Sequence, residues 1–251
     1  MTKFFDLTGR VAIVTGANTG IGQGIAVALA EAGADVALVG RSPAGETVEK
    51  VEATGRRALQ VSADLSTIAP VRDVVDRTIE ELGGLDILVN NAGIIRRADS
   101  VDFTEEDWDA VVDTNLKSLF FLCQAAGRHM IGQGRGKIIN IASMLSFQGG
   151  IRVPSYTASK SGVAGLTKLL ACEWAGKGVN VNAIAPGYIA TNNTAALQAD
   201  ETRNRQIMER IPAGRWGAPA DLGGAAIFLA SPASDYVHGH ILAVDGGWLA
   251  R

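Results

Sequence analysis

Tyr156 and Lys160 are the residues in this sequence best suited by type and spacing to acid/base chemistry. They lie four residues apart in a helical pattern, so their side chains share one face of the helix. The pKa of a free tyrosine is about 10 and that of a free lysine about 10.4, so neither transfers protons well at neutral pH alone. A neighbouring ammonium would stabilise the tyrosinate and lower the tyrosine pKa. Because such a pair is also common on surface helices, its chemistry depends on what surrounds it.

A glycine-rich segment follows the first predicted strand and opens a predicted helix; it reads Thr15-Gly16-Ala17-Asn18-Thr19-Gly20-Ile21-Gly22. Gly16 permits a tight exit from the strand, Gly20 lets the backbone approach a pyrophosphate, and Gly22 lets helix and strand pack closely. The helix start then offers N–H groups and the positive end of its dipole to phosphates. A glycine-rich turn without a ligand is the alternative. The strand–turn–helix context favours a dinucleotide.

Short apolar runs alternate with longer helical patterns along the whole chain. The expected strands are 10–15, 35–39, 58–61, 86–89, 137–141, 179–184 and 241–244. The expected helices are 21–32, 47–53, 69–82, 104–130, 155–175, 201–210 and 221–230. This alternation predicts an α/β fold, a single domain over 1–251 with a Rossmann-type, doubly wound parallel sheet of about seven strands and helices on both faces. The irregular, Asn-rich stretch around 187–217 is predicted to form a substrate lid.

Ligands of such sheets bind beyond the carboxyl ends of the strands, and three polar segments lie there. Ser143 follows the strand 137–141, where its hydroxyl could hold a substrate oxygen. Asp64 follows the third strand and could border a cofactor, cap a helix, or do both. Residues 90–93, Asn-Asn-Ala-Gly, follow the fourth strand. The sequence therefore places candidate ligand-binding groups at one edge of the sheet.

The composition excludes several classes of partner. The chain is 47% hydrophobic and 20% charged, an ordinary balance for a packed globular protein. Its net charge is −3 and it has no basic run, so neither nucleic acid nor an anionic membrane is predicted as a partner. No stretch matches a membrane span or a signal peptide, so the cytoplasm is the expected location. Cys123 and Cys172 are both expected to be buried and reduced.

No metal site is expected. His129, His238 and His240 lack acidic or cysteine partners at ligand spacing, and we interpret them as surface or interface residues. Trp216 and Trp248 could line a pocket or an interface, since tryptophan is frequent in both.

The order and spacing of these motifs resemble the short-chain dehydrogenase/reductase family over essentially the whole chain. The resemblance rests on TGANTGIG, NNAG, Asn115, Ser143, Tyr156-x-x-x-Lys160 and Pro186-Gly187. It implies that Tyr156 donates and accepts the proton, that Lys160 lowers the Tyr156 pKa and binds the nicotinamide ribose, and that Ser143 orients the substrate oxygen. It also implies that Asn115 holds a water in a proton relay.

The same resemblance implies an NAD(P)-dependent enzyme acting on CH–OH groups. The residues expected to bind the cofactor are Gly16, Asn18, Thr19, Gly20, Ile21, Gly22, Arg41, Asp64, Leu65, Asn91, Ala92, Gly93, Tyr156, Lys160, Pro186, Gly187, Ile189 and Thr191. Of these, Pro186, Gly187, Ile189 and Thr191 belong to the segment that contacts the nicotinamide carboxamide in the family.

Longer strings, including IIRR at 94–97 and the stretch 138–163, are similar to a bacterial group of that family that acts on sugar acids. The implied reaction interconverts a secondary hydroxyl and a ketone, on 2-dehydro-3-deoxy-D-gluconate and its 2,5-diketo form. Arg96, Arg97 and Arg152 could bind the substrate carboxylate, although surface ion pairs are the alternative for each. The expected substrate residues are Arg96, Ser143, Gln148, Arg152 and Tyr156.

Two other functions stay open. A β-ketoacyl thioester reductase would share the scaffold and the Asn–Ser–Tyr–Lys set. A regulatory nucleotide-binding protein without catalysis would not need that set intact. The apolar chain end, Ile241–Arg251, together with the family resemblance, predicts a homotetramer, and packing of this tail on its own subunit is the alternative.

The end of the second strand bears on the choice of cofactor. NAD-preferring relatives usually carry an acid there that binds the ribose 2′-hydroxyl, and this chain has Gly40 followed by Arg41. A guanidinium can bind a 2′-phosphate, or it can stack on the adenine and accept either cofactor. We predict that NAD and NADP both work, with NADP slightly favoured.

Overall fold

The computed structural model describes residues 3–251, and its centre is one sheet of seven parallel strands. The strand order is β3-β2-β1-β4-β5-β6-β7. The strands are β1 Val11–Thr15, β2 Asp35–Gly40, β3 Ala58–Ser62, β4 Ile87–Asn90, β5 Gly136–Ile141, β6 Val179–Pro186 and β7 Ile241–Val244. Each lies within two residues of its expected bounds. The predicted doubly wound parallel sheet is confirmed.

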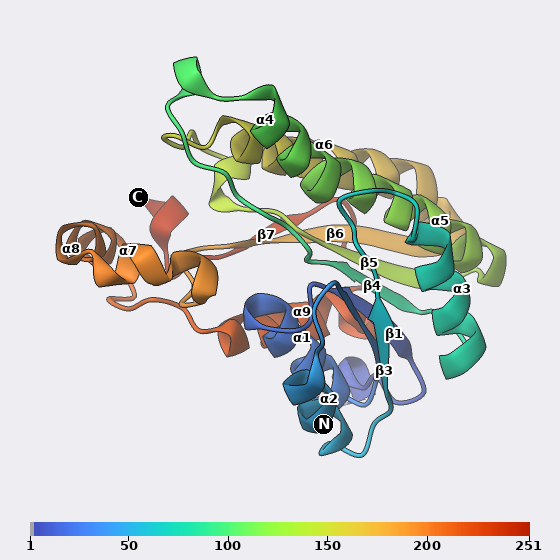
Figure 1. Cartoon of the computed structure of the whole chain (residues 1–251). Coiled ribbons are helices and arrows are strands. Elements are labelled where there is room, and N and C mark those ends of the chain that lie inside the picture. Colours follow the sequence, from blue (N-terminus) through green and yellow to red (C-terminus); the bar gives the residue numbers. More distant parts are fainter. Residues whose placement is uncertain (1–2) are drawn as a thin grey trace.

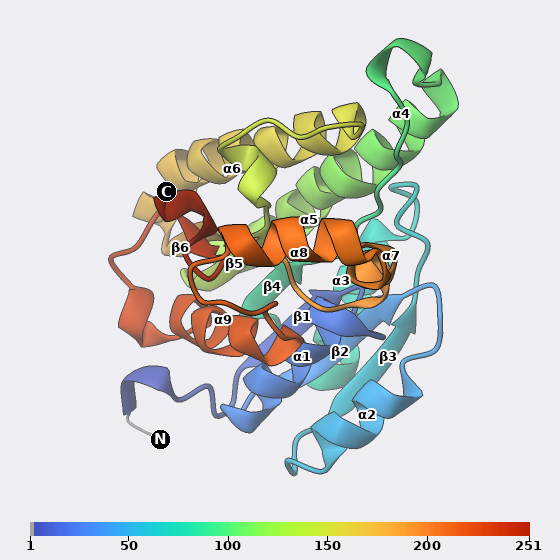
Figure 2. The same ribbon diagram turned by 90° about the vertical axis from the view of Figure 1, so that its left-hand side faces the viewer.

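Helices cover both faces of the sheet (Figures 1 and 2). One layer consists of α1 Gly20–Glu31, α2 Gly45–Glu52 and α9 Gly223–Ala230. The other consists of α3 Val71–Leu82, α5 Ser118–Gln133 and α6 Pro154–Trp174, with α4 Glu105–Val112 packed on α6. Two further helices, α7 Ala195–Ala199 and α8 Glu201–Arg210, project from one edge of the sheet (Figure 1).

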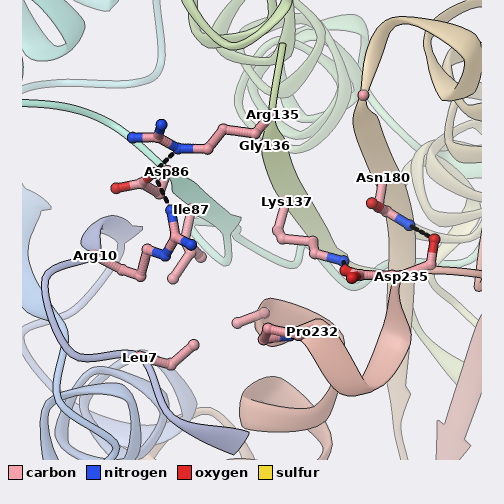
Figure 3. A pocket seen from close by; sticks show the side chains of 12 residues that line it. Leu7, Arg10, Asp86, Ile87, Arg135, Gly136, Lys137, Asn180, Pro232 and Asp235 are labelled. Atoms are coloured by element: carbon pink, nitrogen blue, oxygen red, sulfur yellow. Dashed lines mark hydrogen bonds and ion pairs between the residues drawn. The ribbon is translucent and has the colours of Figure 1, made fainter. Parts of the chain in front are cut away.

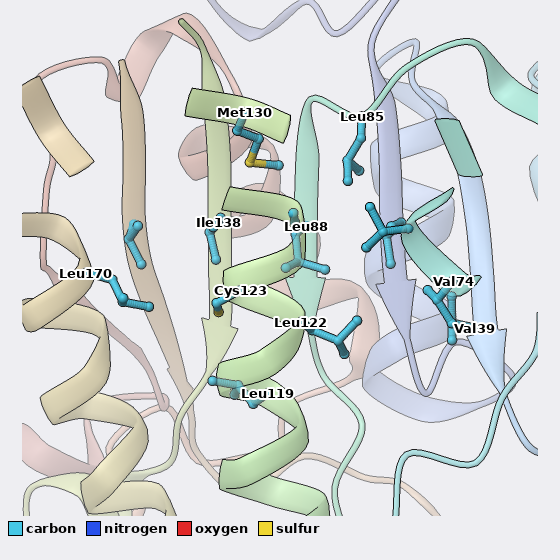
Figure 4. Close-up of a cluster of buried hydrophobic side chains, with 14 of the residues drawn as sticks. Val39, Val74, Leu85, Leu88, Leu119, Leu122, Cys123, Met130, Ile138 and Leu170 are labelled. Atoms are coloured by element: carbon cyan, nitrogen blue, oxygen red, sulfur yellow. The ribbon is translucent and has the colours of Figure 1, made fainter. Parts of the chain in front are cut away.

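The strands are apolar on both sides because helices bury both sides. All five residues of β1 are buried, and Leu88 of β4 and Ile138 of β5 belong to the same buried cluster as Leu122 of α5 (Figure 4). Burial of one such side chain stabilises the fold by about 1.5–3 kcal/mol. Cys123 lies in this cluster, where burial raises the pKa of its thiol to about 12. Cys172 is exposed, so the expectation that both cysteines are buried was wrong for this residue, which lies on the solvent side of α6.

The long helix expected over 104–130 is interrupted. The chain forms α4, then a π-helical turn over Asp113–Lys117, then α5. The Asn115 side chain donates from Nδ2 to the Ile94 carbonyl at 2.9 Å, and its Oδ1 accepts from the Ile94 N–H at 2.8 Å. Asn115 itself is fully buried, and its pairing with a segment 21 residues away holds the wide turn in place, a form that often marks functional positions.

Residues 190–216 form a long insertion after β6 whose two ends are hydrogen-bonded to one another, and we call it the 190–216 excursion. Ile189 and Gly217 form a parallel bridge, and the Ala190 N–H donates to the Gly217 carbonyl at 2.8 Å. The excursion contains α7 and α8, of which only α8 was expected. Across the described part of the chain, 3–251, no helix is long and apolar enough to span a bilayer.

Candidate active site

A cleft of about 430 Å³ opens beyond the carboxyl ends of β1, β2 and β4. It brings together segments that are far apart in the sequence: the glycine-rich turn, the end of β2, the loop after β4, α6 and the start of the 190–216 excursion. The predicted site residues that line it are Gly16, Asn18, Thr19, Gly20, Ile21, Gly22, Arg41, Asn91, Ala92, Gly93, Tyr156, Lys160 and Thr191. The motif residues identified separately in the sequence thus face one space.

Several predicted residues lie outside the lining of this cleft. Leu65 and Ile189 are buried in the core, and Asp64 is exposed. Gly187 and Ile189 border a neighbouring cavity of about 220 Å³. Asn115 and Ser143 are buried in the adjacent wall. The assignment of these residues to the cofactor or the substrate stays a prediction.

The glycine-rich turn is shaped to receive a bound group. Gly16 has a φ of +63°, a conformation that favours glycine. A Cβ on Gly22 would collide with the carbonyl oxygen of Gly16, so the helix start packs directly on the turn. Helix α1 begins at Gly20, and its N-cap Thr19 makes no side-chain capping hydrogen bond. The first N–H groups of α1 are therefore free of a side-chain cap and suit a phosphate.

The loop after β4 is held against this turn by Asn91. Its Nδ2 donates to the Thr15 carbonyl at 2.8 Å, and the Asn91 N–H donates to Thr15 Oγ1 at 2.9 Å. Beneath it, Asn90 Nδ2 donates to Asn140 Oδ1 at 2.9 Å. Hydrogen bonds of this kind between buried polar groups fix the relative positions of strand ends. The floor of the cleft is therefore rigidly built from three neighbouring strands.

Tyr156 and Lys160 share one face of α6, as their spacing predicts. The Lys160 Nζ lies 5.6 Å from the centre of the Tyr156 ring and donates to the Ile141 carbonyl at 2.6 Å. Burial lowers the pKa of Lys160 to about 8. Burial also raises the pKa of Tyr156, while a hydrogen bond with Ser143 and the charge of Arg97 oppose that rise. The protein alone thus keeps Tyr156 protonated at neutral pH.

That direction is opposite to the sequence-based expectation for the Tyr156 pKa. The expectation placed the ammonium of Lys160 next to the phenol and gave it the dominant effect. In the structure that ammonium is directed to a backbone carbonyl, and loss of solvent around the phenol dominates.

Arg41 and Asp64 lie near one another at the outer end of the cleft. A hydrogen bond from the Ser66 N–H is the largest cause that lowers the Asp64 pKa, and the charge of Arg41 contributes further. A Cβ at position 40 would lie 3.9 Å from Asn18 Oδ1, so that position faces the glycine-rich turn. An acid at Gly40 would therefore point at the place where the ribose is expected, and here Arg41 borders it instead.

The three arginines considered for the substrate have different surroundings. Arg96 pairs with Asp107 at 3.1 Å, and Arg152 pairs with Asp99 at 2.9 Å. Arg97 lines the cleft, and its charge acts on Tyr156. The sequence-based list of substrate residues included Arg96 and Arg152 and left out Arg97. It could not foresee this arrangement, because the ion-pair partners Asp107 and Asp99 come from other segments of the chain.

Gln148 lies outside the cleft lining and links three segments, which we call the predicted substrate end. Its Oε1 accepts hydrogen bonds from Arg210 Nη2 on α8 and from Trp248 Nε1 near the chain end, both at 3.3 Å. The Arg210 guanidinium lies 3.9 Å from the centre of the Trp248 ring. Trp248 packs with Tyr188 and Met144 and is only 5% exposed. The apolar tail therefore packs on its own chain, and the apolarity of Trp248 no longer argues for a tetramer.

The histidines lie apart from the cleft lining. His238 and His240 are exposed and His129 is partly exposed. No group of three or more His, Cys, Asp or Glu side chains positioned to hold a metal occurs among residues 3–251.

Comparison with known proteins agrees with this geometry. A family model described as enoyl-(acyl carrier protein) reductase matches residues 16–249. The 2-dehydro-3-deoxy-D-gluconate 5-dehydrogenase of Escherichia coli K12 is 61% identical over 248 residues, which cover 98% of each chain. A crystal structure from Agrobacterium tumefaciens with bound NADP, of a protein assigned as a 2-deoxy-D-gluconate 3-dehydrogenase, is 60% identical, covers 100% of both chains and has a TM-score of 0.94. A 3-oxoacyl (acyl-carrier-protein) reductase from the same organism, also with NADP, is 32% identical over 97% of this chain and 95% of its own, with a TM-score of 0.90.

Proposed function

The chain belongs to the short-chain dehydrogenase/reductase family, and we propose that it is an NAD(P)-dependent enzyme that interconverts 2-dehydro-3-deoxy-D-gluconate and its 2,5-diketo form. The observation that carries the proposal is the single cleft in which the glycine-rich turn, Tyr156, Lys160 and Arg97 meet. The identity to sugar-acid dehydrogenases over nearly the whole chain supports the substrate.

The residues of the cleft fit a nicotinamide dinucleotide. We propose that the uncapped start of α1 and the Gly16–Gly22 turn hold the pyrophosphate, while Arg41 borders the adenosine ribose. Lys160 and the loop Asn91–Gly93 would face the other ribose. NADP bound to the relative from A. tumefaciens supports the phosphorylated form. When bound, the cofactor supplies or accepts a hydride.

Proton transfer is assigned to Tyr156. In reduction, its protonated hydroxyl donates to the ketone oxygen, and the raised Tyr156 pKa keeps this form present at neutral pH. In oxidation, the tyrosinate takes the proton of the substrate hydroxyl, so the oxidative rate should increase with pH. Ser143, whose hydroxyl opposes the rise of the Tyr156 pKa, would hold the same substrate oxygen.

Arg97 is the arginine we assign to the substrate carboxylate. It faces the cleft, whereas Arg96 and Arg152 are each paired with an aspartate. A guanidinium binds a carboxylate through two parallel hydrogen bonds, which orients the acid as well as attracting it. With the carboxylate at Arg97, the rest of a six-carbon acid would lie in the same cleft, which Tyr156 also lines.

Further parts of the proposal concern the whole molecule. We propose that the 190–216 excursion acts as a lid, since Thr191 borders the cleft and packs next to Gly20. We also propose a homotetramer that works in carbohydrate catabolism in the cytoplasm. Leu169 on α6 and Trp108 on α4, both partly exposed and apolar, support association through these helices.

The test is a turnover screen that follows absorbance at 340 nm with NADPH and with NADH. The substrates are 2-dehydro-3-deoxy-D-gluconate, its 2,5-diketo form, D-gluconate and an acetoacetyl thioester. We expect the diketo acid and 2-dehydro-3-deoxy-D-gluconate to give the highest kcat/KM. Faster turnover of the thioester would replace the proposal with an acyl reductase, and no turnover of any substrate would favour a regulatory protein.

A further inference from the structure

A second cavity, of about 200 Å³, opens at the amino ends of the strands, opposite the cofactor cleft (Figure 3). Arg10, Asp86, Lys137 and Asn180 lie at the amino ends of β1, β4, β5 and β6. The turn that carries Pro232 and Asp235 closes the cavity from the side of α9. The strands place it roughly 15–20 Å from the cofactor cleft, and the two linings share no residue.

The charges that line this cavity are unbalanced. Arg10 Nη1 at 3.1 Å and Arg135 Nε at 2.9 Å both contact Oδ1 of Asp86. Lys137 Nζ contacts Oδ1 of Asp235 at 2.7 Å. Three cations thus face two carboxylates, an excess of one positive charge in a chain whose net charge is −3. The second oxygen of Asp86 accepts a hydrogen bond from the Val11 N–H, so both oxygens of this carboxylate have partners within the chain.

Most hydrogen-bond donors of the two guanidinium groups stay available. Within residues 3–251, the guanidinium of Arg135 donates a hydrogen bond only from Nε, and that of Arg10 only from Nη1. The Nη groups of Arg135 and the Nη2 of Arg10 belong to side chains that are 59% and 40% exposed, so a solute can reach them. A guanidinium with free N–H groups is the side chain best suited to an oxyanion.

Lys137 carries its charge at a position where burial disfavours a charge. Its side chain is only 12% exposed, and burial lowers its pKa, although Asp235 opposes that effect. The charge of Arg10 lowers the Lys137 pKa further, which means that the two cations repel one another across the cavity. An anion between them would relieve this repulsion and restore the balance of charge.

We propose that this cavity is a binding site for a small oxyanion of the phosphate class, either inorganic phosphate or the phosphate group of a small ester. Arg135 and Arg10 provide the forked donors, and Lys137 provides a buried point charge. The volume accommodates a group of this size with its bound water. Binding here is independent of the sugar-acid reaction proposed for the other edge. A purely structural ion-pair network is the competing explanation, and it needs no ligand.

Isothermal titration calorimetry with inorganic phosphate tests the site. The protein is saturated with NADPH, so that phosphate cannot occupy the cofactor cleft, and NaCl keeps the ionic strength constant. We expect saturable binding of one phosphate per chain. Arg135→Gln should weaken it about tenfold, because charge-assisted hydrogen bonds are lost. Arg72→Gln is the matched control, since it removes an exposed arginine paired within α3, and it should bind phosphate like the wild type.

Two further arms complete the test. Arg10→Gln serves as the second variant if Arg135→Gln unfolds, and it should weaken binding to a similar degree. Glycerol 3-phosphate in place of phosphate distinguishes the sources: tighter binding points to an ester and equal binding to free phosphate. Absence of saturable heat in the wild type, or equal affinity in Arg135→Gln and Arg72→Gln, would overturn the proposal. The readout is heat, so failure of the sugar-acid assignment leaves this result interpretable.

Discussion

The glycine-rich end of the cleft and the predicted substrate end, where Gln148, Arg210 and Trp248 meet outside the cleft lining, are assembled in different ways. At the glycine-rich end, the lining comes from short contiguous segments that each follow a strand, namely Gly16–Gly22, Arg41 and Asn91–Gly93. At the predicted substrate end, Gln148 is held by Arg210 and Trp248, which are 62 and 100 residues away in sequence. The first end depends on backbone geometry, and the second depends on side chains that meet only in the folded chain.

The two ends should therefore differ in how well they tolerate amino-acid substitutions. Collision of a Cβ at Gly22 with backbone leaves almost no freedom at the cofactor end. The substrate end uses stacking of Arg210 on Trp248 and exposed ion pairs, which can be exchanged at lower cost. Members of one family can therefore keep the cofactor end and change the substrate end, which is consistent with an acyl reductase that shares the fold at 32% identity.

The largest effect is expected at Tyr156, which lines the cleft beside the glycine-rich end. Tyr156→Phe keeps the ring and its packing but removes the transferable proton, so kcat should fall about 10²–10⁴-fold. NADPH binding, measured by fluorescence titration, should be retained because the glycine-rich end is untouched. A variant that keeps most of its kcat would remove Tyr156 from proton transfer.

A smaller loss, confined to the substrate, is expected for Arg97. In Arg97→Met, kcat/KM for the sugar acid should fall about 10- to 100-fold, mainly through KM, because a charged hydrogen-bonding partner of the carboxylate is lost. Arg96→Met and Arg152→Met are the matched controls, since each removes an arginine already paired with an aspartate. If Arg96→Met or Arg152→Met lowers kcat/KM more than Arg97→Met does, the arginine removed in that variant binds the carboxylate instead.

Lys160 gives a prediction for stability rather than rate. Burial lowers its pKa to about 8, whereas an unfolded lysine titrates near 10.4, so between these values the unfolded chain binds more protons. The contribution of Lys160 to stability should therefore rise with pH. Relative to Lys160→Met, the free energy of unfolding of the wild type should increase by about 2 kcal/mol between pH 7 and 9.5 in urea denaturation. Lys117→Met, at an exposed lysine, should show no such trend.

The elements and the cofactor end could be predicted from the sequence because their signals are local. Apolar runs define the strands, and the glycines of Gly16–Gly22 define the turn. The interruption of the long helix at Asn115 could not be predicted, since it depends on hydrogen bonds to Ile94 across the fold. The raised pKa of Tyr156 and the exposure of Cys172 depend on packing between elements, which spacing within one helix does not reveal.

The smallest effect is expected at the outer edge of the cofactor end, where Arg41 borders the cleft and Gly40 leaves out the acid that would repel a 2′-phosphate. Arg41→Ala should lower kcat/KM for NADPH about tenfold, because one charge-assisted contact to the phosphate is lost, and should leave NADH almost unchanged. Initial rates with both cofactors at a fixed sugar-acid concentration measure this ratio. Equal losses would mean that Arg41 stacks on the adenine, which both cofactors share, and does not bind the 2′-phosphate. A wild type that does not use NADPH would show that another carboxylate takes the place of the acid missing at Gly40. The exposed Asp64 is then the side chain to change next, because it is close enough to Arg41 for the arginine charge to lower its pKa.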